Sequence, residues 1–177
     1  MGELTPKSPD YIAGHTSQQT HDDIAELLER LRRRPEIEAV SLSQNSYPYN
    51  GSNSGAEVSY DTLRSPGWTI RRLVTPDFPR VFRYRGTRGE TPEQLAEMLE
   101  RGEFMASDNL YRKYDCRMTD LVGQRFYLFG DTTKTYRLGA ALQNVRYHDY
   151  DQARSSYSMM VKQSFYYIGL EPVSYTH

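Results

Sequence analysis

Val81-Phe-Arg-Tyr-Arg85 runs through the turn Gly86-Thr-Arg-Gly89 into Thr91-Pro-Glu-Gln-Leu-Ala-Glu-Met-Leu-Glu-Arg-Gly102, and this stretch decides the fold class of the 177-residue chain. Its first part is β-branched and aromatic with interleaved arginines, which predicts a strand. Its last part has helical periodicity. A strand, a turn and a helix in this order predict an α+β domain, with a mixed sheet and short flanking helices.

The helix of this stretch carries signals at both ends. Thr91 is a strong N-cap with Gln94 at the capping-box spacing, and Pro92 stands at N1, where its missing N–H costs nothing. Gly102 is the expected left-handed terminator. The stripe that we expect to be buried consists of Leu95, Met98 and Leu99.

On the C-terminal side, three further elements are expected. Arg125-Phe-Tyr-Leu-Phe129 reads as a short buried strand that ends at Gly130. A helix is then predicted from a cap at Asp131, Thr132 or Thr133 to about Val145. The segment 159–169 predicts a long strand before Pro172.

On the N-terminal side, residues 1–20 predict a flexible arm. A helix follows from about Asp22 to Pro35, with an apolar stripe at Ile24, Leu27, Leu28 and Leu31. Short strands are predicted at 39–42 and 68–74, separated by a loop at 43–56. We therefore expect a helical and irregular extension over 21–78 and an α+β body over 79–173.

Composition limits the function classes. Apolar residues make up 37% and charged residues 25% of a chain with net charge −1, which makes nucleic acid an unfavoured partner. The single Cys116 excludes an internal disulfide and fits a cytoplasmic fold. We find no apolar run long enough for a membrane span. The four histidines have no metal-ligand spacing, so no metal is predicted.

Arg83 and Arg85 would share one face of the predicted strand, since strand side chains alternate with a period of two. They lie beside a glycine-containing turn and a helix N-terminus. Guanidinium forks and free amide N–H groups both suit phosphate. The segment is therefore either an anion-binding corner or an ordinary pair of arginines on a solvated sheet face.

The order of these motifs resembles the pertussis-like and cholera-like ADP-ribosylating toxins. In that family an aromatic-Arg pair on the first strand precedes a Pro-containing helix and a Gly-Phe step, here Val81–Arg85, the 91–102 helix and Gly102-Glu-Phe104. The resemblance implies that Arg83 holds the NAD phosphates. Phe126–Ala140 is similar to the next family block, and 166–173 to the strand after it. Together they cover about 80–173.

Two departures from the family pattern leave the function open. Its Ser-Thr-Ser triplet is absent, and Asp131, Thr132 and Thr133 stand in its place as candidate NAD contacts beside Arg83 and Arg85. No Glu-x-Glu or Gln-x-Glu follows Thr133, although transfer through an oxocarbenium-like state needs such a carboxylate.

The resemblance therefore implies an NAD-binding toxin or effector that transfers ADP-ribose to a protein, delivered into host or target cells by a dedicated secretion system. The alternative is a catalytically inactive interaction protein on the same scaffold. It would bind a host or partner protein through a Tyr/Arg-rich surface. No catalytic residue is assigned, and the oligomeric state stays open.

Overall fold

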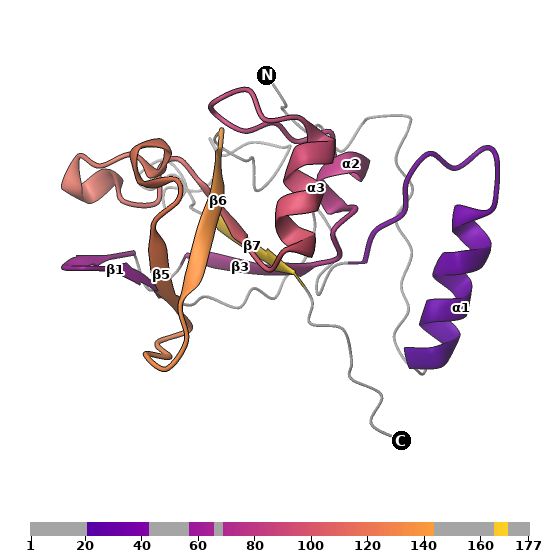
Figure 1. The fold of residues 1–177 in the computed structure, drawn as a ribbon, viewed down its shortest axis with the longest axis horizontal. Helices are drawn as coiled ribbons and strands as arrows, with labels where there is room; N and C mark the ends of the chain where they lie inside the picture. Colours follow the sequence, from indigo (N-terminus) through magenta and orange to yellow (C-terminus); the bar gives the residue numbers. More distant parts are fainter. Residues whose placement is uncertain (1–20, 43–56, 66–68, 144–164, 170–177) are drawn as a thin grey trace, which may run out of the picture.

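The computed structural model describes residues 21–42, 57–65, 69–143 and 165–169 (Figure 1). Within these ranges the chain forms a mixed sheet of seven strands in the order β2-β1-β5-β6-β4-β7-β3. The strands are β1 Val58–Tyr60, β2 Leu63–Arg64, β3 Ile70–Val74, β4 Phe104–Ser107, β5 Arg125–Leu128, β6 Tyr136–Leu142 and β7 Phe165–Gly169. The α+β class with a mixed sheet is confirmed.

Two strand pairs are parallel, β4 with β6 and β3 with β7, and the remaining pairs are antiparallel. The β4–β6 register shifts by one residue between Phe104 and Met105. Parallel strands end at the same edge of the sheet, and here Ser107 pairs with Leu142. This edge is where the 108–124 segment that follows β4 begins.

Short helices flank the sheet: α1 His21–Arg32, α2 Phe78–Val81, α3 Pro92–Glu100 and the 3-10 turns η1 Arg112–Tyr114 and η2 Met118–Leu121. Figure 1 shows α2 and α3 together over the β3, β4 and β7 part of the sheet, with α1 at the periphery. The predicted α1 stripe is only half-buried at Leu27, Leu28 and Leu31. Tertiary packing therefore stabilises α1 less than α3.

The core consists of two clusters of buried side chains. The first packs α2 and α3 against the sheet and contains Val74, Phe78, Phe82, Tyr84, Leu95, Leu99, Met105, Ala140 and Leu142. The second lies under the 108–124 segment and contains Val58, Phe104, Ala106, Leu110, Tyr111, Met118, Phe126, Leu128, Leu138 and Ala141. Because β4 and β6 supply residues to both clusters, the two clusters form one structural unit.

The structure confirms the prediction for α3. The Thr91 hydroxyl accepts from the Gln94 backbone N–H at 3.2 Å, and the Gln94 side chain accepts from the Thr91 N–H at 2.9 Å. Leu95 and Leu99 are buried, and Gly102 has a φ of 77°. The local capping signals therefore determined both ends of the helix.

The predicted strand at 81–85 is wrong. Phe78–Val81 forms α2, with Pro79 in its first turn, and Arg83 adopts a left-handed φ of 52° that no strand allows. The Phe78 and Phe82 rings are in contact one helical turn apart, with their centroids 4.6 Å apart and their planes tilted by 49°. This i, i+4 aromatic pair is the helical signal that the β-branched and aromatic composition concealed.

The predicted helix at 131–145 is also wrong, because residues 136–142 form β6. Phe129 and Gly130 have φ values of 64° and 71°, which reverse the chain after β5 and start a hairpin. Thr135 and Tyr136 favour strand over helix. Residues 144 and 145 lie outside the described part of the chain.

Before residue 78, the structure contains the β1–β2 hairpin, which the sequence did not predict. The strand predicted at 39–42 is wrong, because these residues form no strand. Leu42 nevertheless bonds to Thr75: its backbone N–H donates to Thr75 Oγ1 at 2.9 Å, and its carbonyl accepts from the Thr75 backbone N–H at 2.9 Å. The predicted strands at 68–74, 125–129 and 159–169 correspond in their described parts to β3, β5 and β7. The predicted arm at 1–20 and loop at 43–56 lie outside the described residues.

Candidate functional site

Arg83 and Arg85 flank a buried residue in an irregular segment. Residues 82–86 alternate between buried and exposed, and both arginines are exposed to solvent. Arg83 Nη2 lies 4.0 Å from Glu38 Oε2, and both side chains are largely exposed. An exposed pair at this distance fixes neither side chain firmly.

The 86–90 turn beside Arg83 and Arg85 binds the carboxylate of Glu90. Glu90 Oε2 accepts from the Arg88 backbone N–H at 3.0 Å, and Gly86 N–H donates to the Glu90 carbonyl at 3.1 Å. A Cβ at Gly86 would overlap the Glu90 carboxylate. Glu90 therefore satisfies the backbone N–H of Arg88, and the capping box satisfies those of Thr91 and Gln94. These are amide groups that we expected to be available to phosphate.

Asp131, Thr132 and Thr133 lie in the exposed β5–β6 hairpin loop and do not start a helix. Asp131 Oδ1 accepts from the Thr133 backbone N–H at 2.8 Å and from its hydroxyl. These hydrogen bonds lower the pKa of Asp131. The loop therefore presents a stabilised negative charge and lacks a helix N-terminus, and both features disfavour phosphate.

The five predicted NAD contacts do not come together. Gly86, next to Arg85, bridges to Leu142 at the end of β6, whereas Asp131–Thr133 precedes the start of β6. β6 has seven residues, so its two ends lie about 20 Å apart. Figure 1 shows the loop before α3 and the β5–β6 hairpin at opposite ends of β6.

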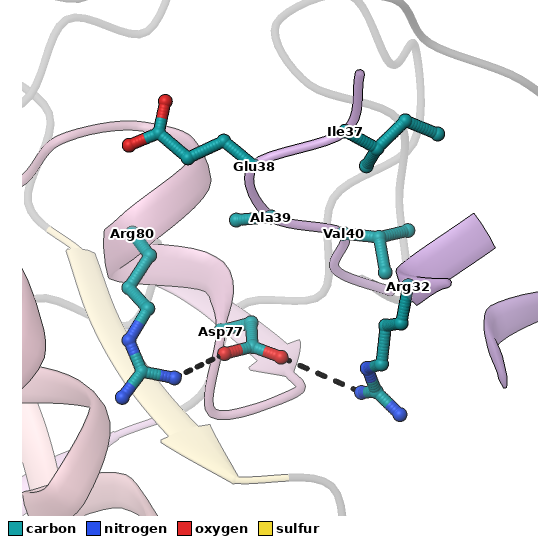
Figure 2. Close-up of a pocket in the computed structure, with 7 residues that line it drawn as sticks. All are labelled: Arg32, Ile37, Glu38, Ala39, Val40, Asp77 and Arg80. Atoms are coloured by element: carbon teal, nitrogen blue, oxygen red, sulfur yellow. Dashed lines mark hydrogen bonds and ion pairs between the residues drawn. The ribbon is translucent and has the colours of Figure 1, made fainter. Parts of the chain in front are cut away.

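A pocket of about 350 Å³ lies between the C-terminal end of α1, residues 37–40 and α2 (Figure 2). Asp77 lies between its two arginines: Oδ2 is 3.4 Å from Arg32 Nη2, and Oδ1 accepts from Arg80 Nη1. The remaining lining residues are Ile37, Glu38, Ala39 and Val40. Because one carboxylate already pairs with both arginines, the pocket does not present a strong anion site.

A polar network that the sequence analysis missed lies at the carboxyl edge of β4 and β6. Asp108 Oδ1 accepts from Thr119 N–H at 2.9 Å and from its hydroxyl at 2.7 Å, while Arg117 Nε donates to Oδ2 at 2.8 Å. Burial acts to raise the pKa of Asp108, but these hydrogen bonds outweigh it and the pKa is lowered. The Thr119 hydroxyl also bonds to Thr87 at 2.7 Å.

This network ties the 87–90 turn to the loops after β4. Asp108 and Thr119 are satisfied by groups of the chain itself. Burial, together with Asp120 and Asp108, raises the pKa of the Cys116 thiol, which disfavours a reactive thiolate.

Another candidate surface is the face of the sheet that points away from the second core cluster. We call it the outer face. Phe126 and Leu128 of β5 are buried in that cluster, so Arg125 and Tyr127 point the other way and are exposed. Register places Ser59 opposite Tyr127, Arg64 opposite Ser59, and Arg137 opposite Arg125. The outer face is defined by Arg64, Ser59, Tyr127, Arg125 and Arg137.

Exposed aromatic residues gather at this end of the sheet. Among the described residues, the exposed large hydrophobic side chains are Tyr114, Tyr127 and Phe129, each about two-fifths accessible. Tyr114 Oη lies 3.4 Å from the Arg64 backbone N on β2, and Phe129 directly follows β5. The period-two pattern Arg125-x-Tyr127 was the sequence signal for this face.

No family model matches this sequence, and the search of curated proteins finds no match. Within the described ranges, no group of three or more histidine, cysteine or acidic side chains could hold a metal ion. Every helix of that same part is too short or too polar to cross a membrane. Function must therefore be argued from the geometry alone.

Proposed function

We propose that this chain is an interaction protein that binds a protein partner through the outer face. One observation carries the proposal: the exposed aromatic residues of the described chain lie on or beside β1, β2 and β5, next to exposed arginines. Tyrosine and arginine are enriched at the centres of protein interfaces, where truncation to alanine costs the most binding energy. Following the resemblance to effectors, the partner is a protein of a host or target cell.

Site-specific photo-crosslinking tests this proposal. A photoreactive amino acid at position 127 should give a discrete crosslinked product in target-cell extract, and the same probe at the exposed position 34 should not. Arg125→Glu in the chain with the probe at 127 should abolish the product, because it reverses the charge beside the probe. Products that are equal at positions 127 and 34 would contradict an interface on the outer face.

NAD binding is a second candidate, supported by the solvent-facing pair Arg83 and Arg85. Without the 131–133 loop, these arginines would bind the pyrophosphate from one side only. Calorimetric titration with NAD should then show weak binding that Arg83→Ala removes. Hydrolysis of NAD or automodification by the pure chain would favour the ADP-ribosyltransferase reading over the interaction protein.

A further inference from the structure

Three arginines share the outer face, and we call these three the row. Arg64 of β2 lies in one cross-strand line with Ser59 of β1 and Tyr127 of β5. Arg125 of β5 and Arg137 of β6 form a second line, two residues away from Tyr127 along β5. Neighbouring strands lie about 4.8 Å apart, and residues on one face of a strand lie about 6.6 Å apart, so the row extends about 16 Å from Arg64 to Arg137. That length matches an extended segment of about five residues.

Neutral groups hold Arg125 in place, whereas Arg64 is held both by backbone carbonyls and by the Glu57 carboxylate, whose Oε1 lies 3.5 Å from Arg64 Nε. Arg125 Nε donates to Thr135 Oγ1 at 2.7 Å, and its Nη2 donates to the Thr135 carbonyl at 3.1 Å. Arg64 Nη1 donates to the carbonyls of Asp61 and Leu63 at 2.7 and 2.9 Å. Neutral acceptors fix a guanidinium without cancelling its charge, which lowers the entropy cost of binding an anion.

Arg125 and Arg137 are directly opposite each other on neighbouring strands. Like charges in this position destabilise a sheet. Arg137 turns away to Glu103, with 2.6 Å between Nη1 and Oε1, while Arg125 turns to Thr135. A carboxylate placed between the two guanidinium groups would replace their repulsion with two attractive interactions.

We infer that the partner presents an acidic, extended protein segment to the outer face, an inference that rests on the proposed function. Carboxylates match the planar guanidinium fork, and the exposed Tyr127 ring lies in the middle of the row for apolar contact. A nucleic acid is less suited, because a chain of net charge −1 lacks the long-range attraction that a polyanion backbone requires.

The test is fluorescence anisotropy of the full chain with a labelled peptide of eight glutamates around one tyrosine. Binding should weaken several-fold between about 50 and 300 mM NaCl, as expected for exposed charge pairs. Arg125→Glu should weaken binding at least about tenfold, and Arg125→Lys less, since lysine keeps the charge but loses the fork. Arg34→Glu, an equal charge change at an exposed site away from the row, should leave binding within about twofold.

Three outcomes would overturn the inference. One is the absence of peptide binding, the second is equal weakening by Arg125→Glu and Arg34→Glu, and the third is tighter binding of an eight-nucleotide oligothymidylate. Position-specific crosslinking at 127 without peptide binding would reject the acidic partner and keep the proposed function. Failure of crosslinking would reject the proposed function itself.

Discussion

At the scale of single residues, Asp108 links the end of β4 to Arg117 and Thr119, which follow it by 9 and 11 residues. It receives three hydrogen bonds from Thr119 and Arg117, and its own backbone N–H donates to the Leu142 carbonyl at 2.8 Å. A carboxylate can accept all three bonds, whereas an amide presents donors in place of one oxygen.

Asp108→Asn should therefore lower the free energy of unfolding by about 1–3 kcal/mol, because it leaves hydrogen-bond donors of Thr119 or Arg117 without an acceptor. Urea unfolding followed by circular dichroism measures the change. Asp131→Asn is the matched control, since Asp131 makes similar bonds in an exposed loop and its loss should have a much smaller effect. Equal effects would contradict a structural role specific to Asp108.

The lowered pKa of Asp108 also predicts how stability depends on pH. Its folded pKa lies below the unfolded value of about 3.9. The stabilisation is therefore fully present above that unfolded value and is lost as pH falls through the folded pKa. Urea midpoints at neutral pH and near pH 3 should differ more for the wild type than for Asp108→Asn; identical pH profiles would refute the assignment.

Gly86 has no Cβ, and the Glu90 carboxylate occupies the space that a Cβ would fill. Gly86→Ala should destabilise the fold by about 1–3 kcal/mol, because the new methyl group displaces Glu90 from the Arg88 N–H. In a Glu90→Ala background the same change should cost less. A double-mutant cycle of unfolding free energies measures this difference, and strict additivity would show that the two residues do not interact.

At the scale of elements, α3 shows a helix whose ends are set locally. Thr91→Ala should lower stability by about 1 kcal/mol, because the Gln94 N–H loses its acceptor. Thr91→Ser should retain most of that stability. Thr132→Ala in the exposed hairpin loop is the control. Thermal unfolding compares the four proteins, and equal midpoints for Thr91→Ala and Thr132→Ala would exclude a capping contribution.

The wrong prediction of a helix at 131–145 has a physical cause. The 131–133 loop contains good helix-capping residues, but Asp and Thr side chains cap turns by the same hydrogen bonds, as Asp131 does here. The pairing of β6 with β4 and β5 then decides between strand and helix. Such pairing joins residues about 10 to 35 positions apart, beyond the range of any local signal.

At the scale of the whole molecule, the two core clusters meet in β4, which gives Met105 to the first and Phe104 to the second. Leu95→Ala should cost about 2–5 kcal/mol and Phe126→Ala about 3–5 kcal/mol, since both side chains are fully buried in different clusters. Each variant should still unfold in one transition, measured by far-UV circular dichroism and intrinsic fluorescence together. Separate transitions for the two probes would show that the clusters unfold independently.

Local sequence predicted that Arg83 and Arg85 share a strand face, and the structure shows both side chains exposed in a segment that is not a strand. It could not show that Asp131–Thr133 lies at the far end of β6, since that depends on strand direction. Nor could it find that Arg64, Arg125 and Arg137 share a face, because strand pairing brings together residues that are far apart in sequence.

The sequence by itself determined α3, its capping box, its Gly102 terminator and the α+β class, because each rests on contacts within a few residues. At 78–81 the sequence carries two local signals, the i, i+4 pair Phe78 and Phe82 and a β-branched and aromatic composition, and packing in the first core cluster decided for the helix. The tertiary structure alone decided that 136–142 is strand and which arginines share a face. Both depend on pairing between distant strands, which has no signature in a short window of sequence.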